Sequence, residues 1–425
     1  MRPQKSGPAH KTGNLAELVC SNSLRGAALE NAVGLLKEEL ARLDSVIVSA
    51  ARESAVPAGG ALAVDRDRFA AAVEARIASE PRIAVRREEV REVPLDRPAI
   101  VACGPLPSDA LLASIDAIVS GAHAEPGRTR LHYFDAASPI VASDSLDESR
   151  MYRKSRYDKG DGADYLNIPL DGERYARLLH DLRTLPRHEM KEFEGTRFFE
   201  GCLPIEVMAD RGDDALRFGP LKPVGLRDPR TGETPYAVVQ LRRENLEGTA
   251  YNLVGFQTQM TWPAQREAFS KLPGLEAAEW LRLGVMHRNT FIDAPRLLDE
   301  TLRLRGGGEL YFAGQITGAE GYVEAAACGA IAGINAARRA LGVPTISLPD
   351  GTALAAVVGH LQNAASPDFQ PANVTWTFFP PLEERGRRLG KRERRAAMAQ
   401  RALAALDAYR AQLQPAAALA GSKAG

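Results

Sequence analysis

A short apolar run, a glycine-rich turn and a long helix of small residues follow one another in residues 309–341. The run ELYFA is typical of a strand, and Gly314, Gly318 and Gly321 in the turn let the backbone pass where a Cβ atom would crowd it. Free N–H groups at the amino end of the following helix attract a pyrophosphate or the electron-rich edge of a flavin. The segment predicts a dinucleotide site, and a purely structural strand-turn-helix is the alternative for the same glycine pattern.

A second segment, residues 199–226, places a lone cysteine in a loop rich in Gly and Pro. Cys202 stands between Gly201 and Leu203-Pro204, a context that fits neither a disulfide nor a metal site. The glycine permits close approach of a substrate, and Pro204 fixes the turn that follows. The thiol is a candidate nucleophile, and a buried structural cysteine is the alternative.

The composition indicates a globular protein of more than one domain. The chain has 425 residues, with 54 Lys and Arg against 54 Asp and Glu, so a nucleic-acid partner requires a local basic surface. The four cysteines show no C-x-x-C spacing and are expected to be reduced thiols. The first residues lack an apolar signal core, and no apolar run has membrane-spanning length. We therefore expect a cytoplasmic protein with no membrane partner and no metal.

Together with residues 15–26, 56–66 and 251–262, the two segments resemble one family closely, the folate- and FAD-dependent tRNA (uracil-5-)-methyltransferases, TrmFO. The likeness extends from Met1 to about residue 370, and motifs such as GCLPIEVMA are long and specific. The family opens with a strand, a G-x-G-x-x-G turn, a helix and a second strand ending in an acidic residue, none of which is found here. A start assigned to an internal methionine is the favoured explanation, because the downstream motifs are intact. Loss of half of the FAD cradle is the other.

The expected fold class is α/β. It comprises a discontinuous Rossmann-like FAD-binding domain, N-terminally truncated, and an inserted α+β domain that contains antiparallel sheet, because short alternating strands dominate the middle of the chain. We place the first part of the FAD domain at residues 1–107 and the inserted substrate and RNA-side domain at 108–304. The second part, with a C-terminal helical region, is placed at 305–413, and a disordered tail at 414–425.

Local patterns predict several elements of this fold. Apolar residues recur every three or four positions through residues 29–47, which predicts one long helix. Asp65 is a candidate N-cap for the next helix. Residues 99–102 are expected to form a strand, and residues 396–413 a helix.

The resemblance implies transfer of the methylene of methylenetetrahydrofolate to C5 of the T-loop uridine of tRNA, with reduction to methyl. Uracil C5 is a poor nucleophile until a thiolate adds at C6, and a base must then remove the C5 proton. The family uses both matching cysteines. We choose Cys202 as nucleophile and Cys20 as base or flavin-side partner, an order that the sequence does not settle. FAD passes on the one-carbon unit, and NAD(P)H reduces the flavin again.

The motif GQI-x-G-x-x-GY and a strand end near residue 104 imply the flavin contacts. They are Gly104, Gly314, Gln315, Gly318, Glu320, Gly321 and Tyr322. Tyr322 is expected to cover the isoalloxazine face, whereas an ordinary turn glycine is the alternative for Gly104. The remaining thiols, Cys103 and Cys328, are expected to be structural.

Two basic stretches are candidates for RNA contact. Residues 152–160 mix cations with tyrosines, which contact phosphates and stack on unpaired bases, and the predicted contacts are Lys154, Arg156 and Lys159. Residues 385–395 hold seven cations against one acid, and a solvated helix face is their simpler interpretation.

Two alternative functions stay open from the sequence. One is the same chemistry on ribosomal RNA, and the other is a truncated, flavin-free RNA-binding remnant without activity. The related flavoprotein that modifies wobble uridine shares GQI-x-G-x-x-GY but lacks GCLPIEVMA.

Overall fold

The computed structural model describes residues 10–104, 106–122, 130–188, 203–363, 369–382 and 389–413, without the side chains of 122, 130–136 and 286–288. The strands are β1 (Ser23–Gly26), β2 (Ala55–Val56), β3 (Ala61–Val64), β4 (Ala99–Val101), β5 (Arg130–Ala136), β6 (Ile140–Ala142), β7 (Tyr152–Arg153), β8 (Tyr165–Leu170), β9 (Ala237–Arg243), β10 (Ala250–Leu253), β11 (Trp280–Arg282), β12 (Met286–Ile292) and β13 (Leu310–Phe312). The helices are α1 (Ala32–Arg42), α2 (Val46–Glu53), α3 (Arg66–Ala78), α4 (Asp109–Ala122), α5 (Gly172–Thr184), α6 (Ile205–Asp210), α7 (Ala215–Phe218), α8 (Trp262–Phe269), α9 (Ala294–Leu297), α10 (Tyr322–Ala340), α11 (Ala353–Leu361) and α12 (Lys391–Leu413).

The strand-turn-helix of residues 309–341 is present. β13 pairs in parallel with β4, with Leu310 opposite Ala99, so both strand predictions are confirmed. The chain then passes through a short 3-10 helix (Gly314–Thr317) and enters α10 after Gly321. Gly314, Gly318 and Gly321 have φ angles of 75°, 84° and 108°, in the region that favours glycine.

The single long helix predicted for residues 29–47 is wrong. Two helices, α1 and α2, occupy this stretch, because Asp44 has a φ of 56° and the Ser45 hydroxyl caps α2 by accepting the Val48 N–H at 3.5 Å. The apolar spacing continues through the break, since α1 and α2 pack on one core. The predicted cap of α3 is confirmed, with Asp65 Oδ1 accepting the Arg68 N–H at 3.0 Å.

The middle of the chain forms the antiparallel sheet that the sequence predicts. Six strands lie in the order β11-β6-β10-β9-β8-β7, with every neighbouring pair antiparallel. Side chains of α5, α6 and α8 join the sheet in one core, Leu178, Ile205 and Phe269 among them.

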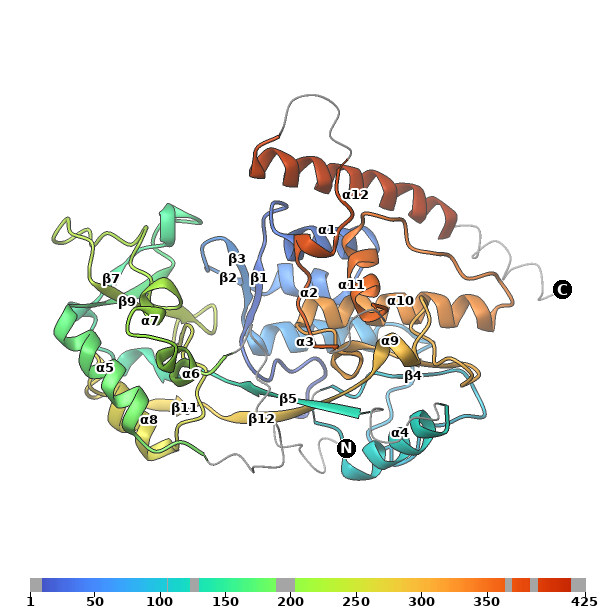
Figure 1. Cartoon of the computed structure of the whole chain (residues 1–425), viewed down its shortest axis with the longest axis horizontal. Helices are drawn as coiled ribbons and strands as arrows, with labels where there is room; N and C mark the ends of the chain where they lie inside the picture. The colour runs from blue at the N-terminus through green and yellow to red at the C-terminus, as the bar shows by residue number, and fades with distance from the viewer. Residues whose placement is uncertain are drawn as a thin grey trace.

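Two apolar cores divide the described part of the chain. The first draws on residues 18–119 and 291–409, and the second on residues 141–275. The amino-terminal and carboxy-terminal stretches therefore form one body together. The second body is formed by the residues between them in the chain. β5 and β12 pair from Ala136–Met286 to Arg130–Ile292 and run between the two bodies (Figure 1). The domain boundaries at 107/108 and 304/305 stay predictions.

The last described element is α12, which confirms the predicted helix of residues 396–413 and begins earlier, at Lys391. It lies across α1 (Figure 1), where Arg42 forms an ion pair with Asp407 at 2.7 Å. The predicted disordered tail, 414–425, lies outside the described residues.

Candidate active site

The Cys20 thiol meets the first residue of α10. The Tyr322 hydroxyl lies 3.0 Å from Sγ of Cys20 and also accepts the Cys20 N–H at 3.0 Å. Burial, and then the neighbouring thiol, raises the pKa of Tyr322 well above its usual value. The hydroxyl therefore keeps its proton at neutral pH and is able to donate it to the sulfur. The sequence did not foresee this contact, and the predicted cover of the isoalloxazine by Tyr322 stays a prediction.

Two arginines hold the backbone around Cys20. Arg66, the first residue of α3, donates to the carbonyl oxygens of Leu18 and Cys20, the second at 2.8 Å. Arg282, the last residue of β11, donates to the Val19 carbonyl at 2.7 Å. Three consecutive carbonyl groups thus accept hydrogen bonds from guanidinium groups, one of which comes from the six-stranded sheet.

The charges beside Cys20 are mostly positive. Burial works to lower the pKa of Arg66, but the Glu244 carboxylate, 2.5 Å away, raises it above its usual value. Burial, and then the charge of Arg66, lowers the pKa of Arg282. Both guanidinium groups remain charged at neutral pH. Such neighbours favour a thiolate over a thiol.

The residues after Cys20 are fixed from β9. Arg242 donates to Asn22 Oδ1 at 3.0 Å and to Ser21 Oγ at 2.8 Å. The Asn22 amide donates in turn to the carbonyl groups of Val64 and Arg243, both at 2.9 Å. Sequence reasoning missed all three arginines, because their partners lie far away along the chain. The one signal that the Cys20 loop has many partners was the length of its motif, LAELVCSNSLRG at residues 15–26.

A buried carboxylate lies in the first turn of α10. Glu324 is 1% exposed, and its Oε1 accepts from Arg25 and from the Val374 N–H at 2.9 Å. Its Oε2 has no hydrogen-bond partner among the described residues. A Cβ atom at Gly321 would come within 2.5 Å of that oxygen. Gly321 is therefore required by both its backbone angle and the space around it.

The other predicted flavin contacts surround the same turn. The Gln315 amide donates to the Glu320 carboxylate at 3.2 Å. A Cβ atom at Gly314 would make an ordinary contact with Ala325, but one at Gly318 would lie 2.7 Å from the ring of Phe369. Packing against Phe369 thus explains the glycine at 318.

Gly104 follows β4 and faces an opening among the described residues. Its φ is 70°, and no atom of those residues would lie within 4 Å of a Cβ atom there. Its neighbour Cys103 is half-buried, and burial raises the pKa of its thiol to about 11. Burial likewise raises the pKa of Cys328 to about 12, so both thiols stay protonated at neutral pH.

Cys202 lies outside the described residues, but the segment after it is anchored firmly. The Ile205 N–H donates to the Gln257 carbonyl at 2.7 Å. Fully buried Glu206 accepts from the Thr258 hydroxyl and from the N–H groups of Gln259 and Met260, at 3.1 and 3.0 Å. These hydrogen bonds connect two motifs that the sequence analysis named separately, GCLPIEVMA and residues 251–262.

The three predicted RNA contacts differ in their surroundings. Lys154 forms an ion pair with Asp158 at 2.5 Å. The guanidinium of Arg156 donates to the carbonyl groups of Val224 and Lys222, and burial lowers its pKa. Lys159 is exposed. Arg156 therefore has a clear structural role, and an RNA role for these residues stays a prediction.

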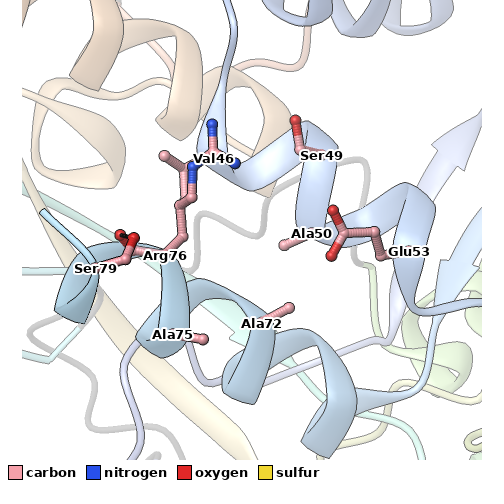
Figure 2. Close-up of a pocket in the computed structure, with 8 residues that line it drawn as sticks. All are labelled: Val46, Ser49, Ala50, Glu53, Ala72, Ala75, Arg76 and Ser79. Atoms are coloured by element: carbon pink, nitrogen blue, oxygen red, sulfur yellow. Dashed lines mark hydrogen bonds between the residues drawn. The ribbon is translucent and has the colours of Figure 1, made fainter.

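A cavity of about 270 Å³ separates α2 from α3 and lies apart from these groups (Figure 2). Alanine and serine side chains line most of it, with Glu53 and Arg76 at its ends. None of the predicted site residues lines it. Across the described ranges, no three His, Cys, Asp or Glu side chains are grouped to hold a metal ion. Nor does any helix in those ranges have the length and apolar character to cross a bilayer.

These features define a class of protein. It has an α/β fold with two bodies, and a strand-turn-helix of the dinucleotide-binding type in the first body contacts the loop of Cys20. The second body, which contains the antiparallel sheet, also holds this loop. Two solved structures share the fold, those of GidA from Aquifex aeolicus in two crystal forms. For form I the TM-score is 0.61 at 16% identity, and the match covers 81% of this chain and 63% of that one. For form II the TM-score is 0.65 at 14% identity, and the match covers 96% and 70%.

The profile of the family described as Glucose inhibited division protein A matches residues 7–344. The chain is 55% identical over 97% of its length to a relative from Heliobacterium modesticaldum, of which it covers 92%. It is 54% identical over 96% of its length to one from Geobacter sulfurreducens, of which it covers 91%. Both relatives are named methylenetetrahydrofolate–tRNA-(uracil-5-)-methyltransferase TrmFO. The chain belongs to the TrmFO family, within the wider GidA family.

Proposed function

We propose that the protein transfers the methylene of methylenetetrahydrofolate to C5 of the T-loop uridine of tRNA and reduces it to a methyl group, with FAD and NAD(P)H. The observation that carries this proposal is the contact of Cys20 with Tyr322 at the start of α10. It brings a thiol to the helix end at which a flavin would bind. A cytoplasmic location is part of the same proposal, because the tRNA and the folate are found there.

The residues of this region fit the flavin end of FAD. No side chain among the described residues caps the first N–H groups of α10, and such groups donate hydrogen bonds to a flavin edge or a phosphate. The opening beside Gly104 and the turn from Gly314 to Tyr322 would hold the cofactor. Bound there, FAD supplies one-carbon transfer and hydride chemistry.

The chain's own groups then handle protons and position the uracil. Tyr322 donates its hydroxyl proton toward Sγ of Cys20, and Arg66 and Arg282 fix the backbone on either side of that sulfur. A thiolate held in this way is able to accept the C5 proton, so Cys20 is assigned the role of base. Cys202 is assigned the attack on C6, and the described segment that follows it in the chain is anchored at Glu206.

The test uses the full chain with FAD, NADPH and methylenetetrahydrofolate labelled in the methylene carbon. We expect label in an unmodified tRNA transcript and none in a transcript whose T-loop uridine is replaced by cytidine. Label in ribosomal RNA but not in tRNA would assign the alternative substrate. Absence of label from both RNAs would contradict the proposed chemistry.

The roles of the cysteines are separated with RNA that contains 5-fluorouracil, which traps the covalent complex. Cys202→Ala should abolish the complex while flavin remains bound, whereas Cys20→Ala should retain it. A normal adduct yield from Cys202→Ala, or its loss only in Cys20→Ala, would reverse the two assignments.

A further inference from the structure

An exposed aromatic ring stands on the loop between β7 and β8. Tyr157 is 58% exposed, and its φ and ψ angles of 58° and 32° place it in the left-handed region. The next residue, Asp158, has a φ of 52°. Two successive non-glycine residues in this conformation are unfavourable, so the surrounding structure must hold them there.

The support comes from the segment that follows α7. The Tyr157 N–H donates to the Gly225 carbonyl at 3.2 Å. A Cβ atom at Gly225 would lie 2.8 Å from two ring carbons of Tyr157, so the ring rests directly on the glycine. Arg156 fixes the same segment through its bonds to the carbonyl groups of Lys222 and Val224. The ring is thus immobilised on one side and open to solvent on the other.

Exposed cations are found on the loop of Tyr157 and at the start of α12. The stem of Lys159 lies against Gly60, whose carbonyl accepts the Ala27 N–H at 2.9 Å. Three residues further on, Glu30 pairs with Arg392 of α12 at 3.3 Å. Gly60 and residues 27–30 thus connect the loop of Lys159 to the first turn of α12, and in Figure 1 the amino end of α12 is the end on the side of the molecule that carries β7. The exposed cations there include Lys391 and Arg394.

We propose that Tyr157 is a stacking platform for an unpaired base of the RNA, and that Lys159, Lys391 and Arg394 contact phosphates beside it. A rigid ring with one open face accepts any base, and its flanking cations suit a polyanion. Two acids of this surface are already paired, Asp158 with Lys154 and Glu30 with Arg392. The inference rests on the proposed function, since it names the surface that the tRNA would use.

Tyr157→Gly is the most direct test, because glycine tolerates the left-handed backbone while removing the ring. We expect tRNA affinity to fall about 5- to 150-fold, the value of one stacked base. Tyr157→Phe keeps the ring and should bind as the wild type does. Trp262→Ala removes an aromatic side chain of matching exposure, 57%, from α8 and should leave affinity unchanged. RNA-independent oxidation of NADPH should be the same in all four proteins.

The cations are tested through salt. Lys391→Ala with Arg394→Ala should lower the slope of log affinity against log salt by about one for each phosphate that the variant no longer neutralises. Tyr157→Gly should leave that slope unchanged, because stacking releases no counterions. Arg97→Ala, at an exposed position before β4, is the control for removal of a cation.

Wild-type affinity in Tyr157→Gly, or equal weakening in Tyr157→Gly and Tyr157→Phe, would overturn the stacking role. An unchanged salt slope in the α12 variant would remove α12 from the surface. These are binding measurements, so they are distinct from failure of the proposed function, which would appear as a wild-type protein that binds tRNA and does not methylate it.

Discussion

Glu39, a buried carboxylate on α1, makes the stability of the fold depend on pH. It is fully buried, and its two oxygens accept the N–H groups of Ala353 and Leu354, at 2.7 and 2.9 Å, at the start of α11. Burial raises the pKa of Glu39 to about 7, although the two N–H groups act to lower it. Desolvation of the charged form therefore outweighs the favourable helix end.

The size of the effect follows from proton linkage. An unfolded glutamate has a pKa of about 4.3, so the folded protein binds this proton more tightly by about 2.7 pKa units, or roughly 3–4 kcal/mol. The native state holds more protons than the unfolded state between about pH 4.5 and pH 7, so stability is lost as pH rises through that window. Above pH 7 the folded protein carries the full cost of a buried charge.

Glu39→Gln removes the titration and keeps an oxygen for one of the two N–H groups, and the loss of the second acceptor is a cost that does not depend on pH. As pH rises from 5 to 8, we expect the free energy of unfolding of the variant to increase by roughly 3 kcal/mol relative to that of the wild type. Urea unfolding followed by far-UV circular dichroism measures both values. Glu38→Gln, a half-exposed position on the same helix, controls for the removal of one negative charge. A difference between Glu39→Gln and wild type that stays constant from pH 5 to pH 8 would refute the reasoning.

Two further predictions concern the anchors of the site. Arg282→Met removes the cation of β11 from the Cys20 loop. Alkylation of Cys20 by iodoacetamide, measured by peptide mass spectrometry, should need a higher pH in this variant than in the wild type. Arg282→Lys should restore the wild-type pH profile. An unchanged profile in Arg282→Met would show that Arg282 is only a structural contact. Glu206→Ala leaves the buried Thr258 hydroxyl without its acceptor and the Gln259 N–H without one among the described residues, and it should destabilise the second core by about 2–4 kcal/mol. A variant with wild-type thermal stability would show that the segment after Cys202 is anchored by other contacts.

Several elements could be predicted from neighbouring residues alone. The glycine turn before Tyr322 is required by local backbone angles, and the cap at Asp65 acts within three residues. The break at Asp44 could not be predicted, because the apolar spacing on either side of it is continuous and both helices serve one core. Periodicity reports which faces are buried and not where the backbone turns.

The strand-turn-helix, the two candidate cysteines and the family could all be read from residues close together in the chain. How Cys20 is held depends on packing between distant segments. Its partner Tyr322 lies 302 positions away, and Arg282 lies 263 positions from Val19. The first contact forms when the two ends of the chain assemble the first core, and the second forms when the six-stranded sheet packs beside that core. No local spacing encodes them, so the groups that position the thiol appear only in the folded protein.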